Sequence, residues 1–303
     1  MKKAVFLFLV MSIAYIVHAQ EGWNLLPFVP SQTLRDVHCV NKDTVLAVGD
    51  YGYIVRTING GIHWDSIYST TNNDLYKIKF VNNSIGFICG KNGTLLKTEN
   101  SGLTWTKIEI PTSLNLLNIS FINQNTGWIV GGTGIPSFLY GNKGVLLKTN
   151  NIGMNWEIDT SYNFTLSSVF FIDKDTGYVS MNNYLLTTIA KTTDGGKSFQ
   201  FIVCDSLVNA YATDICFITP QTGYYISRCK ENDFDKSGIF KTMDYGQTWE
   251  KIVKVADIVN AYFFDTCILY YTHFEMPGSG SYYYNICQDY IEEFPYFNGM
   301  HLL

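Results

Sequence analysis

The stretch Lys148-Thr149-Asn150-Asn151-Ile152-Gly153-Met154-Asn155-Trp156 has four counterparts elsewhere in this 303-residue sequence. Each copy reads basic residue-Thr-x-Asn/Asp-x-Gly-x-x-aromatic, and the other copies span Arg56–Trp64, Lys97–Trp105, Lys191–Phe199 and Lys241–Trp249. Neighbouring copies end 41 to 51 residues apart. A period of this length is typical of repeat architectures in which each repeat is one supersecondary unit.

The residues between the copies have the pattern of short β-strands. Leu75–Val81 and Ile85–Ile88 flank a polar turn, and Gly93–Lys97 leads into the next copy of the motif. A further strand-like segment follows each aromatic residue. Four short strands per repeat, separated by turn residues, is the make-up of a propeller blade. We therefore predict an all-β fold, a β-propeller of six four-stranded blades, with seven blades as the alternative.

The two ends of the chain decide the number of blades. Three strand-like segments without the motif follow the fifth copy: 258–264, 266–272 and 281–287. At the other end, Gly22–Leu26 resembles the strand after each motif, because Trp23 and Leu26 are spaced like Trp64 and Ile67. We predict that this N-terminal strand completes the last blade, which would close the ring and cover an exposed sheet edge.

The first 19 residues have the features of a signal peptide. Lys2 and Lys3 precede an apolar run over residues 4–17, and small residues lead to a cleavage site after Ala19. No later stretch has the roughly 20 apolar residues of a membrane-spanning helix. We expect residues 20–303 to form one exported propeller domain, monomeric, in the periplasm, outside the cell or at its surface.

Composition narrows the classes of partner. The net charge of −5 disfavours nucleic acid, which usually requires a basic face, and 47% hydrophobic residues allow a sizeable core. The seven cysteines include no Cys-x-x-Cys pair. Buried free thiols are expected, and Cys216 with Cys229 is the one pair that we would test for a disulfide.

The residue types of the motif suit a fixed turn. An Asn or Asp side chain accepts hydrogen bonds from the following backbone, Gly takes a positive φ, and the aromatic ring packs between strands. We therefore expect these residues to be structural and not to contact a ligand. They are Asn59, Trp64, Asn100, Trp105, Asn151, Trp156, Asp194, Phe199, Asp244 and Trp249.

The motif resembles the Asp-box, or BNR, repeat, and this resemblance covers the whole chain after residue 19. Within that group, the run of strand, Thr-Gly-aromatic, Gly-x-Leu-Leu-Lys-Thr and box is most similar to propellers related to the photosystem II assembly and stability factor, which also occur in non-photosynthetic bacteria. The resemblance implies a non-enzymatic assembly or docking role. Photosynthetic members are generally seven-bladed and use an arginine-rich patch. Since this chain has three arginines, we do not expect it to share the photosystem partner.

Sialidases also carry the Asp-box, but the residues their chemistry requires are missing. Their sites hold a carboxylate with three convergent arginines, whereas this chain has only Arg35, Arg56 and Arg228. Arg56 lies in a box, and the Phe/Tyr-Arg-Ile-Pro element is absent. Other hydrolase and nucleotide motifs are also missing. A glycoside hydrolase needs only two carboxylates brought together by the fold, so it stays as an alternative, but we expect no enzyme and no catalytic residue.

One loop resembles a calcium-binding sequence. Asp233, Asp235 and Ser237 alternate before a glycine, and Asp244 falls where the last ligand of an EF-type loop would lie. Asp244 already belongs to a box, so a polar hairpin is the simpler interpretation. We expect neither a metal nor a cofactor.

The ligand-binding face is predicted from the insertions. In a propeller the first and third turns of each blade share one face with the boxes, while the second turns and the connections between blades share the other. The longer repeats have their extra residues in second turns, and functional residues concentrate in such loops. The aromatic residues expected there are Tyr51, Phe138, Tyr140, Tyr184 and Phe234. They suit a segment of an envelope or secreted protein as the partner, or a glycan as the alternative.

Overall fold

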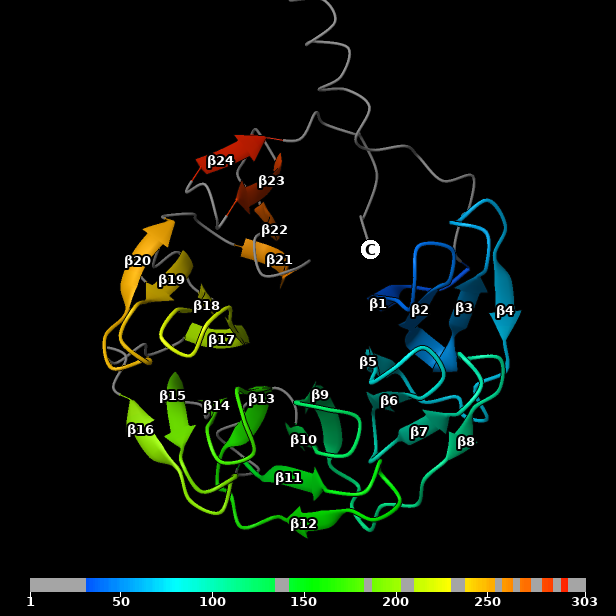
Figure 1. The fold of residues 1–303 in the computed structure, drawn as a ribbon, viewed down its shortest axis with the longest axis horizontal. Coiled ribbons are helices and arrows are strands. Elements are labelled where there is room, and N and C mark those ends of the chain that lie inside the picture. The colour runs from blue at the N-terminus through cyan, green and yellow to red at the C-terminus, as the bar shows by residue number, and fades with distance from the viewer. Residues whose placement is uncertain are drawn as a thin grey trace, which may run out of the picture.

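The computed structural model describes residues 31–133, 142–182, 187–202, 210–229, 238–253, 258–263, 268–273, 280–285 and 290–293. Within these residues the strands form six four-stranded antiparallel sheets, set around a common centre like the blades of a propeller (Figure 1). The all-β fold with four strands per repeat was therefore predicted correctly. No helix in the described part of the chain is long and apolar enough to cross a membrane.

The strands follow one another in chain order within each sheet. The first sheet contains β1 (Leu34–Cys39), β2 (Val45–Gly49), β3 (Ile54–Thr57) and β4 (Asp65–Ile67), with a short 3-10 turn, η1 (Asp50–Gly52), between β2 and β3. The second contains β5 (Leu75–Phe80), β6 (Gly86–Gly90), β7 (Leu95–Thr98) and β8 (Thr106–Lys107). The third contains β9 (Asn115–Phe121), β10 (Gly127–Gly132), β11 (Gly144–Thr149) and β12 (Glu157–Asp159).

The second half of the chain repeats this order. The fourth sheet contains β13 (Thr165–Phe171), β14 (Gly177–Asn182), β15 (Thr187–Thr192) and β16 (Gln200–Ile202). The fifth contains β17 (Ala210–Phe217), β18 (Gly223–Cys229), β19 (Gly238–Thr242) and β20 (Glu250–Val253). The sixth contains β21 (Ile258–Phe263), β22 (Ile268–His273), β23 (Gly280–Asn285) and β24 (Tyr290–Glu293). The first strand of each sheet lies nearest the centre and the fourth lies outermost (Figure 1).

The fourth strand of the sixth sheet differs from the prediction. Tyr290–Glu293 occupies that position and pairs with β23, so that Tyr282 faces Glu293 and Asn285 faces Tyr290. The predicted N-terminal strand around Trp23 lies outside the described residues, and its assignment as the fourth strand was wrong. A hairpin with a short loop loses less chain entropy on closing than pairing between the two ends of the chain.

Apolar side chains between neighbouring sheets form the core. Between the first and second sheets, Leu46 and Val48 are fully buried against Ile78 and Ile88. The box residue Trp105 is 4% exposed and meets Phe80 edge to face, with 6.1 Å between ring centroids. Such contacts repeat between neighbouring sheets among the first five, because each strand alternates its side chains between the two faces of its sheet.

The glycine of each Thr-Gly-aromatic turn makes room for a ring. A Cβ on Gly127 would lie 2.4 Å from Cδ1 of Phe121, on the neighbouring strand. Since real atoms do not approach so closely, any side chain here would displace the ring. The next residue, Trp128, is fully buried and stacks on Phe171 of the fourth sheet. The glycine therefore allows one aromatic layer to pack across the sheet boundary.

Candidate functional site

The turns of the structure lie on two opposite faces, as predicted. We call the end with the boxes the box face, where Ser101 of the second box donates its backbone N–H to the Ser84 carbonyl oxygen, 2.9 Å away in the first turn of the same sheet. We call the other end the loop face. There Lys91 N–H, in the second turn of the second sheet, donates to the Asp74 carbonyl oxygen in the connection from the first sheet, at 2.8 Å.

On the box face, each box is a turn closed by its own side chains. In the third sheet, Asn151 Oδ1 accepts hydrogen bonds from the Thr149 hydroxyl and from the Asn155 backbone N–H, both at 3.0 Å. Thr149 Oγ1 accepts in turn from Gly153 N–H, also at 3.0 Å. The Thr–Asn/Asp and Thr–Gly bonds recur in the other four boxes. These side chains are occupied in holding the turn.

The boxes also join neighbouring sheets, which the sequence did not reveal. Lys148 Nζ and Trp128 Nε1 of the third sheet both donate to the carbonyl oxygen of Gly195 in the fourth box, each at 3.1 Å. One sheet further, the Tyr178 hydroxyl and Lys191 Nζ donate to the Tyr245 carbonyl oxygen, at 2.7 Å and 3.3 Å.

Arg56 makes the same kind of contact between the first and second sheets. Its Nε donates to the Ser101 carbonyl oxygen at 2.9 Å. The guanidinium is therefore engaged between boxes, which agrees with its expected equivalence to the box lysines. Of the other two arginines, Arg35 lies on β1 near the loop face, and the side chain of Arg228 lies outside the described part.

A polar seam nearer the centre also links sheets. Asp36 Oδ2 accepts the Ile78 N–H at 2.8 Å, and Lys77 Nζ lies 3.4 Å from Asp36 Oδ1. Ser168 Oγ accepts the Ile215 N–H at 3.2 Å and donates to Asp214 Oδ1 at 3.0 Å. Burial raises the pKa of Asp36, while the Lys77 charge opposes this shift. These polar groups hold one inner strand to the next.

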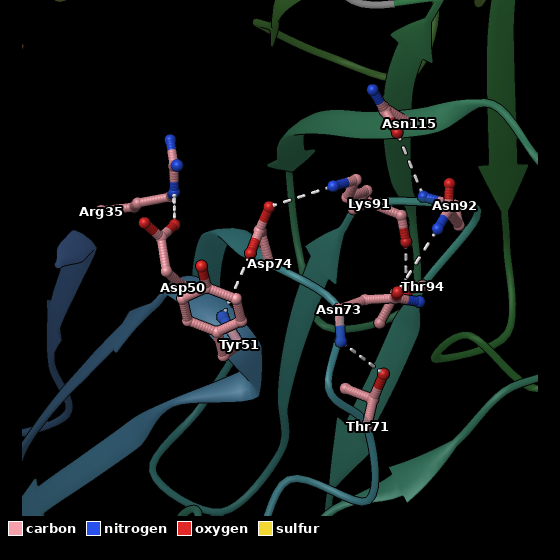
Figure 2. Close-up of polar contacts among 10 residues, drawn as sticks. All are labelled: Arg35, Asp50, Tyr51, Thr71, Asn73, Asp74, Lys91, Asn92, Thr94 and Asn115. Carbon is pink, nitrogen blue, oxygen red and sulfur yellow. Dashed lines mark hydrogen bonds and ion pairs between the residues drawn. The ribbon is translucent and has the colours of Figure 1, made fainter. Parts of the chain in front are cut away.

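The loop face carries an exposed tyrosine in an unusual conformation. Tyr51 lies in the turn between β2 and β3 with φ 56° and ψ 31°, in the left-handed region that non-glycine residues seldom occupy. The residue is 70% exposed. Its backbone N–H donates to Asp74 Oδ1 at 3.1 Å (Figure 2). Only glycine fits at the following position, Gly52, because a Cβ there would lie 2.0 Å from the Thr71 carbonyl oxygen.

Two ion pairs flank Tyr51. Arg35 Nε bonds to Asp50 Oδ1 on one side, and on the other Lys91 Nζ lies 3.5 Å from Asp74 Oδ2 (Figure 2). Partial burial lowers the pKa of Arg35, but the hydrogen bond and charge of Asp50 outweigh this effect and raise it above its usual value. Arg35 also lies over the ring of Tyr76, with Cζ 5.3 Å from the ring centroid.

The second sheet repeats this arrangement with a different side chain. Asn92 replaces Tyr51, with φ 54°, and its N–H donates to Asn115 Oδ1 at 3.1 Å. The Asn92 amide also donates to Asn73 Oδ1 at 3.3 Å, and the Asn73 amide donates to Thr94 Oγ1 at 2.9 Å. A polar network therefore runs from the first sheet to the third (Figure 2). We refer to Arg35, Asp50, Tyr51, Asp74, Lys91 and Asn92 as the loop-face cluster.

Of the aromatic residues predicted for this face, the structure describes Tyr51. The other four, Phe138, Tyr140, Tyr184 and Phe234, lie outside the described residues, as do Asp233, Asp235 and Ser237 of the calcium-like loop. Sequence reasoning missed Asp74, Lys91 and Asn92. The repeated Gly-x-x-Gly turns at 49–52 and 90–93, each facing a polar residue before the next sheet, could have indicated them.

Cysteine and metal chemistry add no second site within the described residues. Cys216 is a free thiol, paired with Tyr224 in the sheet, so the structure shows no disulfide between Cys216 and Cys229. Burial raises the pKa of Cys216 to about 12. Cys89 is free and buried, and Cys39 is free but exposed. In the described ranges no group of three His, Cys, Asp or Glu side chains could hold a metal ion.

A protein-family model matches most of the chain. The model described as "Photosynthesis system II assembly factor YCF48" matches residues 19–100 and 98–261. No curated protein matches the sequence. Among solved structures, "YCF48 bound to D1 peptide" is 17% identical, with 82% of this chain and 92% of that chain covered and a TM-score of 0.44.

Two carbohydrate-active enzymes have a similar fold. The GH74 enzyme of Niastella koreensis is 14% identical, covers 88% of this chain and 46% of its own, and has a TM-score of 0.64. An oligogalacturonate lyase in complex with manganese is 8% identical, with 85% and 75% covered and a TM-score of 0.61. At such low identity these likenesses show a shared fold and nothing about activity.

Proposed function

Because the chain belongs to the photosynthesis system II assembly factor YCF48 family, we propose that it is a non-enzymatic docking protein that binds a segment of another protein. A YCF48 protein has been solved with a D1 peptide bound, so a protein that carries the family name binds a peptide. Family membership supports a role of this general kind.

The observation that carries the proposal is Tyr51. A tyrosine in the left-handed region is less favourable than the asparagine found at the equivalent position of the second sheet. Its ring gains little from packing, since it is 70% exposed. Strained residues persist where the surrounding structure holds them, and they cluster at ligand sites. Tyrosine and arginine are also enriched among the residues that dominate protein interfaces.

Further parts of the proposal rest on the sequence. We propose that residues 1–19 direct export, that the mature protein works in the periplasm or outside the cell, and that it is a monomer. We also propose that the six described sheets are the blades of a six-bladed ring. The charged groups beside Tyr51 are largely paired with each other, which also suits a neutral, hydroxyl-rich ligand. A glycan is therefore the second candidate.

A peptide selection tests the main proposal. A displayed library of random 12-residue peptides is selected on the purified protein, and the strongest peptide is measured by calorimetry. Tyr51→Ala should weaken its binding by at least about tenfold, as expected for an interface anchor. Tyr68→Ala is the matched control, because Tyr68 is 82% exposed and makes no contact with the loop-face cluster among the described interactions.

Three outcomes would count against protein docking at this site. The first is that no peptide is selected. The second is that Tyr51→Ala binds the peptide as tightly as the original protein does. The third is a glycan array that gives binding which Tyr51→Ala abolishes, in which case the glycan candidate replaces the protein one.

A further inference from the structure

We infer that Asp74 is the positioning residue of the loop-face cluster, which fixes Tyr51 of the first sheet and Lys91 of the second in one arrangement. This inference rests on the proposed function, because positioning matters only if Tyr51 contacts a ligand. Asp74 itself is placed to hold other residues: its side chain is 21% exposed, against 49% for Lys91.

Asp74 uses three different acceptor atoms for these contacts. Oδ1 accepts the Tyr51 backbone N–H at 3.1 Å, and Oδ2 lies 3.5 Å from Lys91 Nζ. Its backbone carbonyl oxygen accepts the Lys91 N–H at 2.8 Å. One residue in the connection between two sheets therefore bonds to the second turn of both (Figure 2).

The next repeat separates the two roles of the side chain. Asn115, the first residue of β9, holds the equivalent position, and its Oδ1 accepts the Asn92 N–H at 3.1 Å, the same distance as in the first sheet. An amide oxygen is therefore enough to hold a left-handed residue in this turn. The second carboxylate oxygen of Asp74 has a separate role, which is to place the ammonium group of Lys91.

The position of Tyr51 depends on this contact more than that of Asn92 does. Asparagine enters the left-handed region readily, whereas a tyrosine needs support from its surroundings. Without the acceptor, the turn can relax to the extended region and carry the ring to a different place. A ring that is already fixed loses less conformational freedom on binding, so Asp74 should affect affinity without touching the ligand.

Amide hydrogen exchange tests, without any ligand, whether Asp74 holds the turn that contains Tyr51. Exchange of the Tyr51 amide should be about tenfold faster in Asp74→Ala, since a hydrogen bond to a charged acceptor is lost. Asp74→Asn should restore slow exchange, because Asn115 does the same with an amide. Asn115→Ala is the control for position, and it should speed exchange at Asn92 and leave Tyr51 unchanged.

Binding of the selected peptide completes the test. Asp74→Ala should weaken binding several-fold by freeing the turn, and Asp74→Asn should recover most of the loss. The inference is overturned if Tyr51 exchange is the same in Asp74→Ala as in the original protein. It is also overturned if Asp74→Asn exchanges as fast as Asp74→Ala, since the acceptor oxygen would then be irrelevant.

The two readouts separate this inference from the proposed function. If Asp74→Ala speeds Tyr51 exchange while Tyr51→Ala leaves peptide binding intact, the positioning contact exists but the proposed site is wrong. If Tyr51→Ala abolishes binding while Asp74→Ala changes neither exchange nor affinity, the site stands and the positioning role is wrong.

Discussion

Lys148 Nζ lies 3.1 Å from the carbonyl oxygen of Gly195, so a side chain of the third sheet is bonded to the box of the fourth. Trp128 Nε1 donates to the same oxygen at the same distance. Gly195 is buried, and its carbonyl group is therefore satisfied by two donors from the neighbouring sheet.

Because these donors share an acceptor, their substitutions should not be additive. Lys148→Met should lower the free energy of unfolding by about 1 kcal/mol, since Trp128 still donates. In the double variant Lys148→Met, Trp128→Phe the buried oxygen loses both donors, so the loss should exceed the sum of the two single losses. Urea unfolding measures this. Lys174→Met, at an exposed ion pair, is the control and should have little effect. Strict additivity would show that the shared oxygen does not couple the sheets.

The two boxes with aspartate should make the protein sensitive to acid. Hydrogen bonds from Thr248 lower the pKa of Asp244 from 3.8 to about 2, and those from Ser198 hold the pKa of Asp194 well below its usual value. The unfolded chain therefore takes up protons first as the pH falls. This contribution to stability is present above about pH 4 and is lost as the pH falls toward about 2.

Replacement of both aspartates by asparagine tests this expectation. Asn59, Asn100 and Asn151 hold their boxes without a charge, so Asp194→Asn, Asp244→Asn should still fold. Its melting temperature should fall less between pH 4 and pH 2 than that of the original protein. Parallel melting curves across this range would show that the box carboxylates contribute nothing to acid sensitivity.

Tyr51→Asn should separate stability from binding. It installs the residue of the equivalent turn in the second sheet, which tolerates φ near 54°. We expect stability to rise by up to about 1 kcal/mol as the strain is relieved, while the peptide affinity falls as in Tyr51→Ala. Thermal unfolding and calorimetry on the same sample measure both quantities. A loss of stability would mean that the exposed ring stabilises the fold.

Two glycines with positive φ should respond differently to alanine. A Cβ on Gly93 would lie 2.1 Å from the Thr112 carbonyl oxygen, whereas the nearest atom to a Cβ on Gly60 is 3.8 Å away. Gly60→Ala should cost only the left-handed strain, about 1 kcal/mol. Gly93→Ala must also displace a backbone segment and should cost clearly more. Equal losses in urea unfolding would show that the connection at Thr112 moves aside freely.

Most of the fold could be predicted because its signals are local. The box determines the turn between third and fourth strands, since Thr149 and Asn151 close it with their own hydrogen bonds. The last strand could not be predicted in this way. Tyr290–Glu293 follows no box, whereas Trp23 matches the spacing of the post-box strands. β24 pairs with β23 because the two strands are close together in the sequence. The spacing of Trp23 and Leu26 carries no information about this.

The candidate site could be predicted only in part. The loop face could be predicted from the general arrangement of turns in a propeller. Tyr51 could be predicted as part of it because it lies in a second turn. Asp74 was not visible, because its role depends on a hydrogen bond to a backbone group 23 residues earlier. A single acidic residue before a strand has no periodicity. The role of Asp74 is apparent from the neighbouring repeat, in which Asn115 has the same hydrogen-bond geometry.

The contact between a box and the preceding sheet also has an evolutionary consequence. The third and fourth repeats each carry a donor for the box that follows, and the fourth also carries the acceptor for the repeat before it. A copy of such a repeat, inserted by gene duplication, would carry both a donor for the box that follows it and an acceptor for the donor of the repeat before it. Whole repeats could therefore be gained or lost while the hydrogen bonds between neighbouring sheets are kept.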